Sequence, residues 1–343
     1  MVRVPTLPRV ESATDRDHML RAVALAAAVR RTTAPNPWVG CVLVTADGRV
    51  VEGATHPPGG PHAEAAALAA AAEQGVDPHG ATAYITLEPC SHHGRTPPCA
   101  DALVAAGIDR VVVGIEDPDR QVAGRGIARL GAAGVEATVG VAADVVAEQL
   151  AAYVTHRTTG RPHVVLKLAA GLDGGTAAAD GTSRWITGEA ARADAHGLRA
   201  DSDAILVGAG TVRTDDPSLT VRHVVGSDPL RVVLGTAPPG ARVHPCVEVG
   251  GDLGDVLDDL GARGIVQLLV EGGPTVAGAF HRAGLVDRYV LYLAPVLFGG
   301  DDGPRLFTGP GAATMADVWR GRITGVTALG DDIRVDLQPP RSN

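Results

Sequence analysis

Long apolar runs are absent from this chain. The longest, such as ALAAAV and AEAAALAAAAEQG, are short, alanine-rich or interrupted by charge, so no segment qualifies as a transmembrane helix. The N-terminal stretch MVRVPTLPRVESATDRD lacks the apolar segment of a signal peptide. We therefore expect a cytoplasmic protein, in a compartment where disulfides are rare and a close cysteine pair is more often a metal or redox site.

Basic residues are also in short supply. Lysine and arginine number 30 against 39 aspartates and glutamates, which gives a net charge of −9 and disfavours a nucleic-acid protein with a large basic face. A small anionic substrate remains compatible, because a phosphate needs only a local arginine or lysine. Aromatic residues make up only 3% beside abundant alanine and glycine, which indicates a bias in composition rather than a function.

The chain is too long for one average domain. With 343 residues, 45% of them hydrophobic, it predicts two well-filled domains. Helix and strand patterns alternate in both halves, which is typical of α/β layers, and a polar Gly/Pro stretch at 158–162 predicts the linker. We expect domains at 1–157 and 162–343. The expected segments are a helix at 15–29, a hairpin at 38–56, helices at 61–75, 97–107 and 126–134, strands at 81–90, 109–118 and 135–140, and then alternating segments at 164–171, 203–211, 230–235, 255–264, 266–273, 275–284, 288–295 and 331–338.

Two of the four cysteines lie in the segment LEPCSHHGRTPPC. Cys90 follows a strand and Cys99 begins a helix, and His62 and Glu64 stand upstream in PHAE. Three ligands, His62, Cys90 and Cys99, would leave the fourth tetrahedral position of a zinc ion to water, the arrangement of a catalytic site. Glu64 would carry the proton from that water to a leaving ammonia, as in zinc deaminases.

Other interpretations of the cysteine pair stay open at this point. A closed structural zinc site would take His92 or His93 as its fourth ligand, and two isolated cysteines are often core residues. A redox pair is disfavoured because the spacing is not C-x-x-C. The eight residues between the cysteines replace the short gap of nucleoside deaminases and form a polar lip that suits a phosphorylated sugar.

The second half carries weaker signals. GAGTVR contains only two of the glycines of a G-x-G-x-x-G motif, so a Rossmann site is poorly supported. In VEGGPTVAGAF a strand ends at Glu271 and a glycine pair leads into a helix near Pro274, where backbone N–H groups would hold a phosphate; a plain strand-to-helix turn is the alternative. Lys167 would otherwise be an edge-strand charge, and Arg199 and Arg222 solvated surface charges.

Several motifs in order give a specific resemblance over nearly the whole chain. NPWVGCVLV, HAE, TLEPCSHHGRTPPC, EDPDRQVAGRGI, LKLAAGLDG, SRWITGEAAR, ILVGAGTVRTDDPSLTVR and LVEGGPTV resemble those of the bifunctional deaminase/reductase family of bacterial riboflavin biosynthesis. The resemblance implies a cytidine-deaminase-like α/β/α sandwich followed by a dihydrofolate-reductase-like α/β domain. It implies zinc-dependent deamination of a phosphoribosylamino-diaminopyrimidinone, and then reduction of the ribosyl group to ribityl with NADPH.

The resemblance also assigns residues by motif. In the first domain it implies His62, Cys90 and Cys99 as zinc ligands, Glu64 as the proton carrier, and a pyrimidine pocket lined by Asn36, His56, His92 and Arg95. In the second domain it places Lys167 at the reacting sugar, with Glu271 as a further candidate for polarising that centre. Cofactor contacts are implied for Ala169, Trp185, Thr211, Asp215, Gly273, Pro274, Thr275, Val276, Ala277, Gly278 and Ala279, and substrate contacts for Ser183, Arg199, Leu219, Arg222 and Glu271. The two arginines suit the 5-phosphate.

Four features depart from the family pattern. Arg95 and Gly175 stand where lysine is common, Asp119 stands where asparagine is usual, and the stretch 234–254 is short and is expected to lack a strand–loop unit beside the cofactor site. Two alternatives therefore remain: a deaminase whose reductase-like half is inactive and only binds, and a non-enzymatic scaffold with a closed zinc site. The resemblance further implies a homo-oligomer formed through the reductase domains, with no nucleic-acid or membrane partner.

Overall fold

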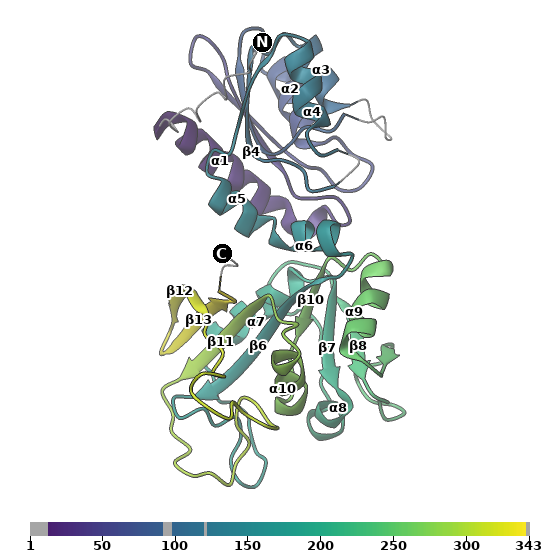
Figure 1. The fold of residues 1–343 in the computed structure, drawn as a ribbon, viewed down its shortest axis with the longest axis vertical. Coiled ribbons are helices and arrows are strands. Elements are labelled where there is room, and N and C mark those ends of the chain that lie inside the picture. The colour runs from purple at the N-terminus through teal and green to yellow at the C-terminus, as the bar shows by residue number, and fades with distance from the viewer. Residues whose placement is uncertain (1–12, 92–97, 120–121, 341–343) are drawn as a thin grey trace. The chain divides into compact units, whose positions relative to one another are not determined.

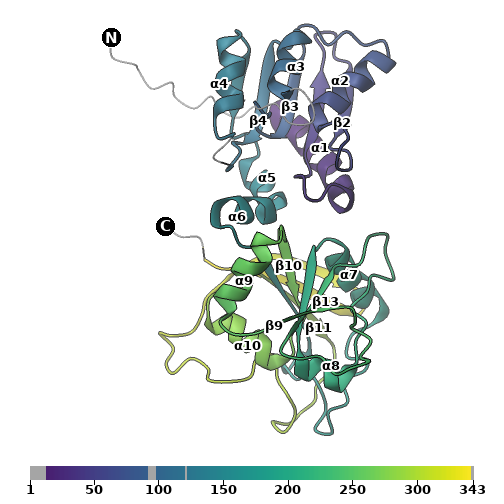
Figure 2. The same cartoon turned by 90° about the vertical axis from the view of Figure 1, so that its right-hand side faces the viewer.

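The computed structural model describes residues 13–91, 98–119 and 122–340. It divides into two compact units, Met1–Thr158 and Thr159–Asn343, each of which is shown in Figures 1 and 2. Within the described ranges, no helix combines the length and apolar character that a membrane crossing requires. Each unit is built around a single sheet of its own.

The first unit contains a five-stranded sheet in the order β2-β1-β3-β4-β5. The predicted hairpin at 38–56 is confirmed, since β1 pairs with β2 in antiparallel register on either side of the turn at Asp47-Gly48. β1 is also antiparallel to β3, whereas β3, β4 and β5 run parallel. The strands are β1 Gly40–Val44, β2 Val50–Ala54, β3 Thr82–Leu87, β4 Arg110–Ile115 and β5 Glu136–Val139.

Helices cover both faces of this sheet, which gives the expected α/β/α sandwich (Figure 1). α1 and α5 contact each other on one face, and α2, α3 and α4 form a contiguous layer on the other. The helices are α1 Ala13–Val29, α2 Ala63–Glu73, α3 Cys99–Ala105, α4 Arg125–Ala132, α5 Ala143–Gln149 and α6 Ala151–Thr159, with a short 3-10 turn η1 at Arg30–Thr32.

Small residues let α2 lie close to the sheet. Ala63, Ala67 and Ala71 recur every four residues and are fully buried on one face of the helix. A Cβ atom on Gly53 of β2 would lie 2.3 Å from the Ala67 backbone nitrogen, so only glycine fits there. The alanine-rich sequence therefore has a packing role here, because it brings the N-terminus of α2 to a fixed position beside the sheet.

The second unit is built on an eight-stranded sheet in the order β12-β13-β11-β6-β10-β7-β8-β9. Its strands from β11 to β9 are parallel to their neighbours, and β13 and β12 add an antiparallel edge. The strands are β6 His163–Gly171, β7 Ala204–Gly208, β8 Leu230–Leu234, β9 Val247–Val249, β10 Gln267–Val270, β11 Arg288–Ala294, β12 Arg322–Leu329 and β13 Asp332–Gln338.

Alternation along the central strands separates two hydrophobic cores. Val164, Leu166 and Leu168 of β6 pack with α9 (Leu253–Ala262) and α10 (Pro274–Arg282) on one face. Val165 and Ala169 face the opposite core, which α7 (Glu189–Ala200) and α8 (Ala209–Asp215) cover. Because side chains alternate along a strand, Lys167 also points toward the α7 face.

Three expectations for this unit need correction. Lys167 is not an edge-strand charge, because β6 lies between β11 and β10 in the interior of the sheet. The segment 203–211 changes from strand to helix at Ala209, where α8 begins. The stretch 234–254 was expected to lack a strand–loop unit, but Val247–Val249 forms β9 and pairs with β8 at the sheet edge.

Candidate active sites

The predicted metal ligands of the first unit converge on one point. The His62 Nδ1 atom lies 3.7 Å from the Cys90 Sγ atom and 3.5 Å from the Cys99 Sγ atom. A tetrahedral zinc with ordinary Zn–N and Zn–S bond lengths separates a nitrogen and a sulfur ligand by about 3.6 Å. The three donor atoms all lie within 4.8 Å of one another, so their chemistry and spacing fit a zinc ion.

Each ligand is placed by the end of an element. His62 immediately precedes α2, Cys90 follows the carboxyl end of β3, and Cys99 is the first residue of α3. The backbone N–H of Cys99 donates to the Cys90 Sγ atom at 3.3 Å. Contacts with the Cys99 thiol and the His62 ring lower the pKa of Cys90 to about 4, which favours the thiolate that a metal requires. All four cysteines of the chain are free of disulfides, which is incompatible with a disulfide at this pair.

Glu64 lies in the first turn of α2 and lines the same cavity as His62 and Cys90. Its side chain is buried, and this burial raises the pKa of the carboxyl to about 7. A carboxyl with this pKa can both accept and release a proton near neutral pH. It has the properties that a proton carrier of a deaminase needs.

The cavity around these residues has a volume of about 700 Å³, within the usual range for a small-molecule site. Of the residues predicted to line the pyrimidine pocket, Asn36 lies on its wall. His56 is exposed and does not contribute to the wall. His92 and Arg95 fall outside the residues that the structure describes, as does His93, one of the two alternative fourth ligands.

Glu88, one residue after β3 and two before Cys90, has a role that the sequence did not reveal. Its buried carboxylate accepts hydrogen bonds from four backbone N–H groups, at distances of 2.8 to 3.2 Å. The donors are the backbone N–H groups of residues 117, 124, 126 and 127. A Cβ atom on Gly126 would lie 1.9 Å from the Pro89 carbonyl oxygen, so the two segments are in direct contact. Glu88 thus fixes residues 117, 124, 126 and 127 against the strand that leads to Cys90.

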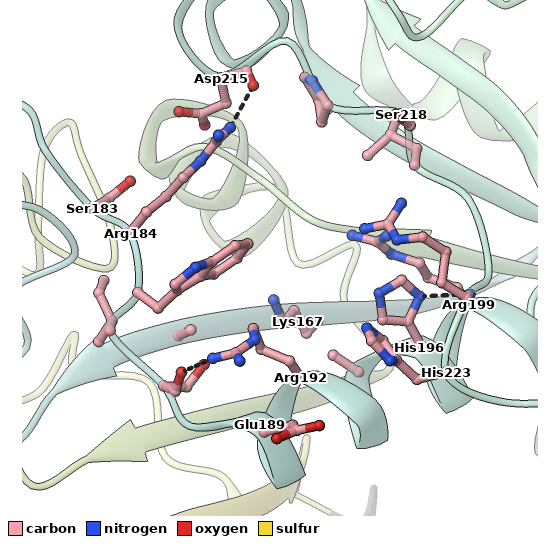
Figure 3. Close-up of a pocket in the computed structure, with 18 of the residues that line it drawn as sticks. Lys167, Ser183, Arg184, Glu189, Arg192, His196, Arg199, Asp215, Ser218 and His223 are labelled. Carbon is pink, nitrogen blue, oxygen red and sulfur yellow. Dashed lines mark hydrogen bonds between the residues drawn. The ribbon is translucent and has the colours of Figure 1, made fainter.

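A second cavity, of about 770 Å³, lies in the second unit (Figure 3). The carboxyl ends of neighbouring parallel strands meet at one sheet edge, which is where ligands bind in sheets of this kind. Figure 3 shows Lys167 on its strand, with Ser183 and Arg184 to one side and His196 and Arg199 to the other. The predicted residues on this wall are Lys167, Ala169, Ser183, Trp185, Arg199, Asp215, Leu219 and Arg222.

Arg199 and Glu271 form a two-point ion pair inside this unit. The Arg199 Nε and Nη2 atoms donate to the two carboxylate oxygens of Glu271 at 2.7 and 2.8 Å, and Nη1 donates to the Thr220 carbonyl at 3.0 Å. Burial alone would raise the pKa of Glu271, but the charges of Arg199 and Lys167 outweigh it and lower the pKa to about 2. Glu271 does not line the cavity, and it holds Arg199 in place at its edge.

Several basic residues that line this cavity were not predicted from the sequence. His196 is buried, and burial together with the charges of Arg199 and Arg222 lowers its pKa to about 4, so the ring is neutral at pH 7. Its Nδ1 atom accepts the backbone N–H of Arg222 at 3.2 Å. A signal existed, because residues 192, 196 and 199 follow the i, i+4, i+7 spacing of one helix face. The cavity residues that were missed include Arg184, Arg192, His196, His223 and Arg242.

The predicted cofactor residues lie in two groups. Ala169, Trp185 and Asp215 line the cavity, and Trp185 is 70% exposed. Thr211 of α8 lies beside the start of α10, where its Oγ1 atom accepts the Gly273 N–H at 3.0 Å. No side chain caps the N-terminus of α10, so its first N–H groups are suited to an anionic group of a dinucleotide such as NADPH. The remaining predicted residues, Pro274, Thr275, Val276, Ala277, Gly278 and Ala279, belong to this helix.

Comparison with protein families matches each unit separately. Residues 12–115 match the cytidine and deoxycytidylate deaminase zinc-binding region, and residues 162–335 match the RibD C-terminal domain. Fold and sites together define a bifunctional enzyme in which a zinc-dependent deaminase precedes an NADPH-dependent reductase.

Full-length relatives give the family. The riboflavin biosynthesis protein RibD of Escherichia coli strain K12 is 41% identical and aligns over 94% of this chain and 99% of its own length. RibD of Mycobacterium tuberculosis strain H37Rv is 43% identical, over 90% of this chain and 93% of its own. The chain belongs to the RibD family of bifunctional enzymes of riboflavin biosynthesis.

Solved structures extend the likeness to three dimensions. Acinetobacter baumannii RibD, form 1, is 38% identical to this chain with a TM-score of 0.87, and the match covers 95% of this chain and 99% of the Acinetobacter chain. A diaminohydroxyphosphoribosylaminopyrimidine deaminase/5-amino-6-(5-phosphoribosylamino)uracil reductase of Thermotoga maritima is 32% identical with the same TM-score and coverage. Because relatives match along both units, the alternatives of an inactive reductase-like half and of a non-enzymatic scaffold are not supported.

Proposed function

We propose that residues 1–157 deaminate 2,5-diamino-6-(5-phosphoribosylamino)pyrimidin-4(3H)-one and that residues 162–343 then reduce the ribosyl group of the product, 5-amino-6-(5-phosphoribosylamino)uracil, to ribityl. The Thermotoga maritima relative carries the names of these two activities. The observation that carries the proposal is the convergence of His62, Cys90 and Cys99 beside the buried Glu64 in one cavity.

In the deaminase, zinc supplies the Lewis acidity that makes water a nucleophile near neutral pH. Glu64 accepts a proton from the attacking water and donates it to the departing amino group, so that the ring carbon exchanges its amino group for oxygen and ammonia leaves. A pKa near 7 suits both transfers. Asn36, on the cavity wall, orients the ring, and we assign His92 and Arg95 to the same pocket; His56 lies off the wall and is left without a role there.

In the reductase, NADPH supplies a hydride for C1 of the opened ribose. We assign Lys167 to polarise that carbon, because its side chain is the basic group that β6 presents on the cavity wall. Glu271 keeps its charge and orients Arg199, while Arg222 is left as the better candidate for the 5-phosphate. Ser183 and Leu219 complete the substrate side. Ala169, Trp185, Thr211, Asp215 and the first turn of α10 form the cofactor side.

We further propose a cytoplasmic homo-oligomer that associates through its reductase domains. The edge strand β12 exposes Ile323 at 60% and Val326 at 64%, and apolar side chains on an open sheet edge favour pairing with another copy.

Purified enzyme tests the two activities. We expect ammonia release from the phosphoribosylated diaminopyrimidinone, and oxidation of NADPH only after that release. Glu64→Gln should abolish ammonia release while zinc content stays at one per chain and the reductase still consumes NADPH with the deaminated substrate. Ammonia release by Glu64→Gln at the wild-type rate would contradict the assignment of the proton carrier. NADPH oxidation before deamination would contradict the order of the steps.

A further inference from the structure

The deaminase cavity is acidic, with one exception. Among the described residues on its wall, four carry carboxylates: Glu64, Glu88, Asp117 and Asp119. Apart from the metal ligand His62, the single basic side chain among them is Arg157. A substrate with a 5-phosphate brings two further negative charges into this cavity, so its phosphate requires a cation to bind.

Arg157 is held at the cavity by two contacts. Its Nε atom lies 3.8 Å from the Asp119 Oδ2 atom, and its guanidinium carbon lies 5.2 Å from the centre of the Tyr153 ring. The side chain remains 38% exposed, so it borders both the cavity and solvent. This is the position expected for the phosphate end of a substrate whose ring lies deep at the metal site.

The two residues that contact Arg157, Tyr153 and Asp119, are themselves held by hydrogen bonds to Asp117. The Tyr153 hydroxyl is buried and donates to the Asp117 Oδ1 atom at 3.1 Å, and Asp117 accepts the Asp119 N–H at 2.9 Å. Glu88 accepts the backbone N–H of Asp117 at 3.1 Å. A connected set of hydrogen bonds therefore runs from the segment before Cys90 to the partners of Arg157. Such pre-organisation reduces the cost of ordering a long side chain when a ligand binds.

We propose that Arg157 binds the 5-phosphate of the deaminase substrate and that Asp119 positions its guanidinium. This assignment rests on the proposed function of the first unit. A guanidinium presents two parallel N–H donors to a phosphate, a geometry that lysine or glutamine cannot supply. At 3.8 Å the contact with Asp119 is longer than a hydrogen bond, so a phosphate offers Arg157 shorter contacts than the enzyme does.

The test compares two substrates and four enzymes. The substrates are the phosphoribosylated diaminopyrimidinone and the same compound after removal of its phosphate by a phosphatase. The enzymes are the wild type, Arg157→Gln, Arg157→Lys, and Arg21→Gln as a matched control. Arg21 is an exposed arginine of α1 that pairs with Glu52 and does not line the cavity. Ammonia release gives kcat and KM for each combination.

We expect Arg157→Gln to raise KM for the phosphorylated substrate about tenfold or more, with kcat changed less than twofold, and to leave the dephosphorylated substrate unaffected. Arg157→Lys should recover part of the loss, and Arg21→Gln should match the wild type. An equal effect of Arg157→Gln on both substrates, or no effect on either, overturns the assignment. Zinc content and NADPH oxidation by the same variant distinguish lost binding from lost folding.

Failure of the proposed function has a different signature. If the wild type releases ammonia from neither substrate, the substrate class itself is wrong, and the assignment of Arg157 falls with it. If the wild type prefers the dephosphorylated compound, the enzyme is a deaminase that does not use the phosphate, and only the inference about Arg157 is overturned.

Discussion

Arg199 and Glu271 meet through two parallel hydrogen bonds of 2.7 and 2.8 Å, although 72 positions separate them in the sequence. Their side chains are only 14% and 9% exposed. A buried pair of this kind contributes little net stability when both partners are present, but removing one leaves an unpaired charge in the interior. The pair therefore links the folding of the second unit to the position of a basic residue at its cavity.

Removing one partner should cost more than removing both. We expect Glu271→Ala to lower the free energy of unfolding of the second unit by about 3 kcal/mol, because it leaves the Arg199 guanidinium buried without a carboxylate. The double variant Glu271→Leu with Arg199→Met should lose much less. Denaturant unfolding of this unit is monitored by the loss of NADPH binding. Ammonia release should be unaffected in both the single and the double variant. Additive losses would contradict the coupling.

The same pair predicts a pH dependence. The folded pKa of Glu271 is about 2, below the value of about 4.3 for an unfolded glutamate, so the pair stabilises the fold above that unfolded pKa. This stability is lost as pH falls through the folded pKa, when the buried carboxylate gains a proton. The difference in unfolding free energy between wild type and Glu271→Gln should be largest at pH 6 and should shrink by about 3 kcal/mol toward pH 2. A difference that stays constant over this range would show that Glu271 does not titrate with Arg199.

Glu88 should support the deaminase site through its backbone hydrogen bonds, without taking part in the chemistry. Glu88→Gln keeps the size of the side chain but has one acceptor oxygen fewer for four N–H donors, and an unsatisfied buried donor costs about 1–3 kcal/mol. We expect a lower melting temperature of the first unit, with KM for the deaminase substrate raised and the reductase unaffected. Glu116→Gln is a suitable control, because Glu116 is exposed and makes none of these bonds. Equal melting temperatures for Glu88→Gln and wild type would contradict the role.

The sequence predicted most of the parallel-sheet architecture because alternating apolar patterns and Gly/Pro turns are local signals. The convergence of the candidate metal ligands was also predictable, since His62, Cys90 and Cys99 all stand at element ends that the same signals identify. The motifs identified Glu271 as a candidate site residue without showing that its carboxylate forms an ion pair with Arg199. That contact depends on the parallel pairing of β6, β10 and β7, which no local pattern specifies.

Other features were beyond local reasoning for a physical reason. The sequence did not reveal the role of Glu88, because that role depends on backbone N–H donors at 117, 124, 126 and 127 that approach its carboxylate only in the folded chain. His196 lies on α7, for which no helix was expected from the sequence, so its alignment with Arg199 went unnoticed. The sequence does not decide whether Lys167 lies at a sheet edge, because strand order in a sheet is set by tertiary pairing rather than by the strand itself.

Gly175 stands where the family commonly has lysine, and in this chain the Phe298 side chain occupies the space that a side chain at position 175 would need. A Cβ atom at position 175 would lie 2.4 Å from the Phe298 Cδ2 atom, closer than any contact that real side chains make. We expect Gly175→Ala to destabilise the second unit by about 1–3 kcal/mol, since Phe298 must move to admit it. Phe298→Ala in the same chain should remove most of that penalty, because the space then opens. Gly210→Ala is the control, as a Cβ there meets nothing within 4 Å. Thermal unfolding of the wild type, Gly175→Ala, Phe298→Ala and the double variant forms a double-mutant cycle, and a penalty for Gly175→Ala that persists without the Phe298 ring would show that the backbone, not the ring, excludes a side chain at this position.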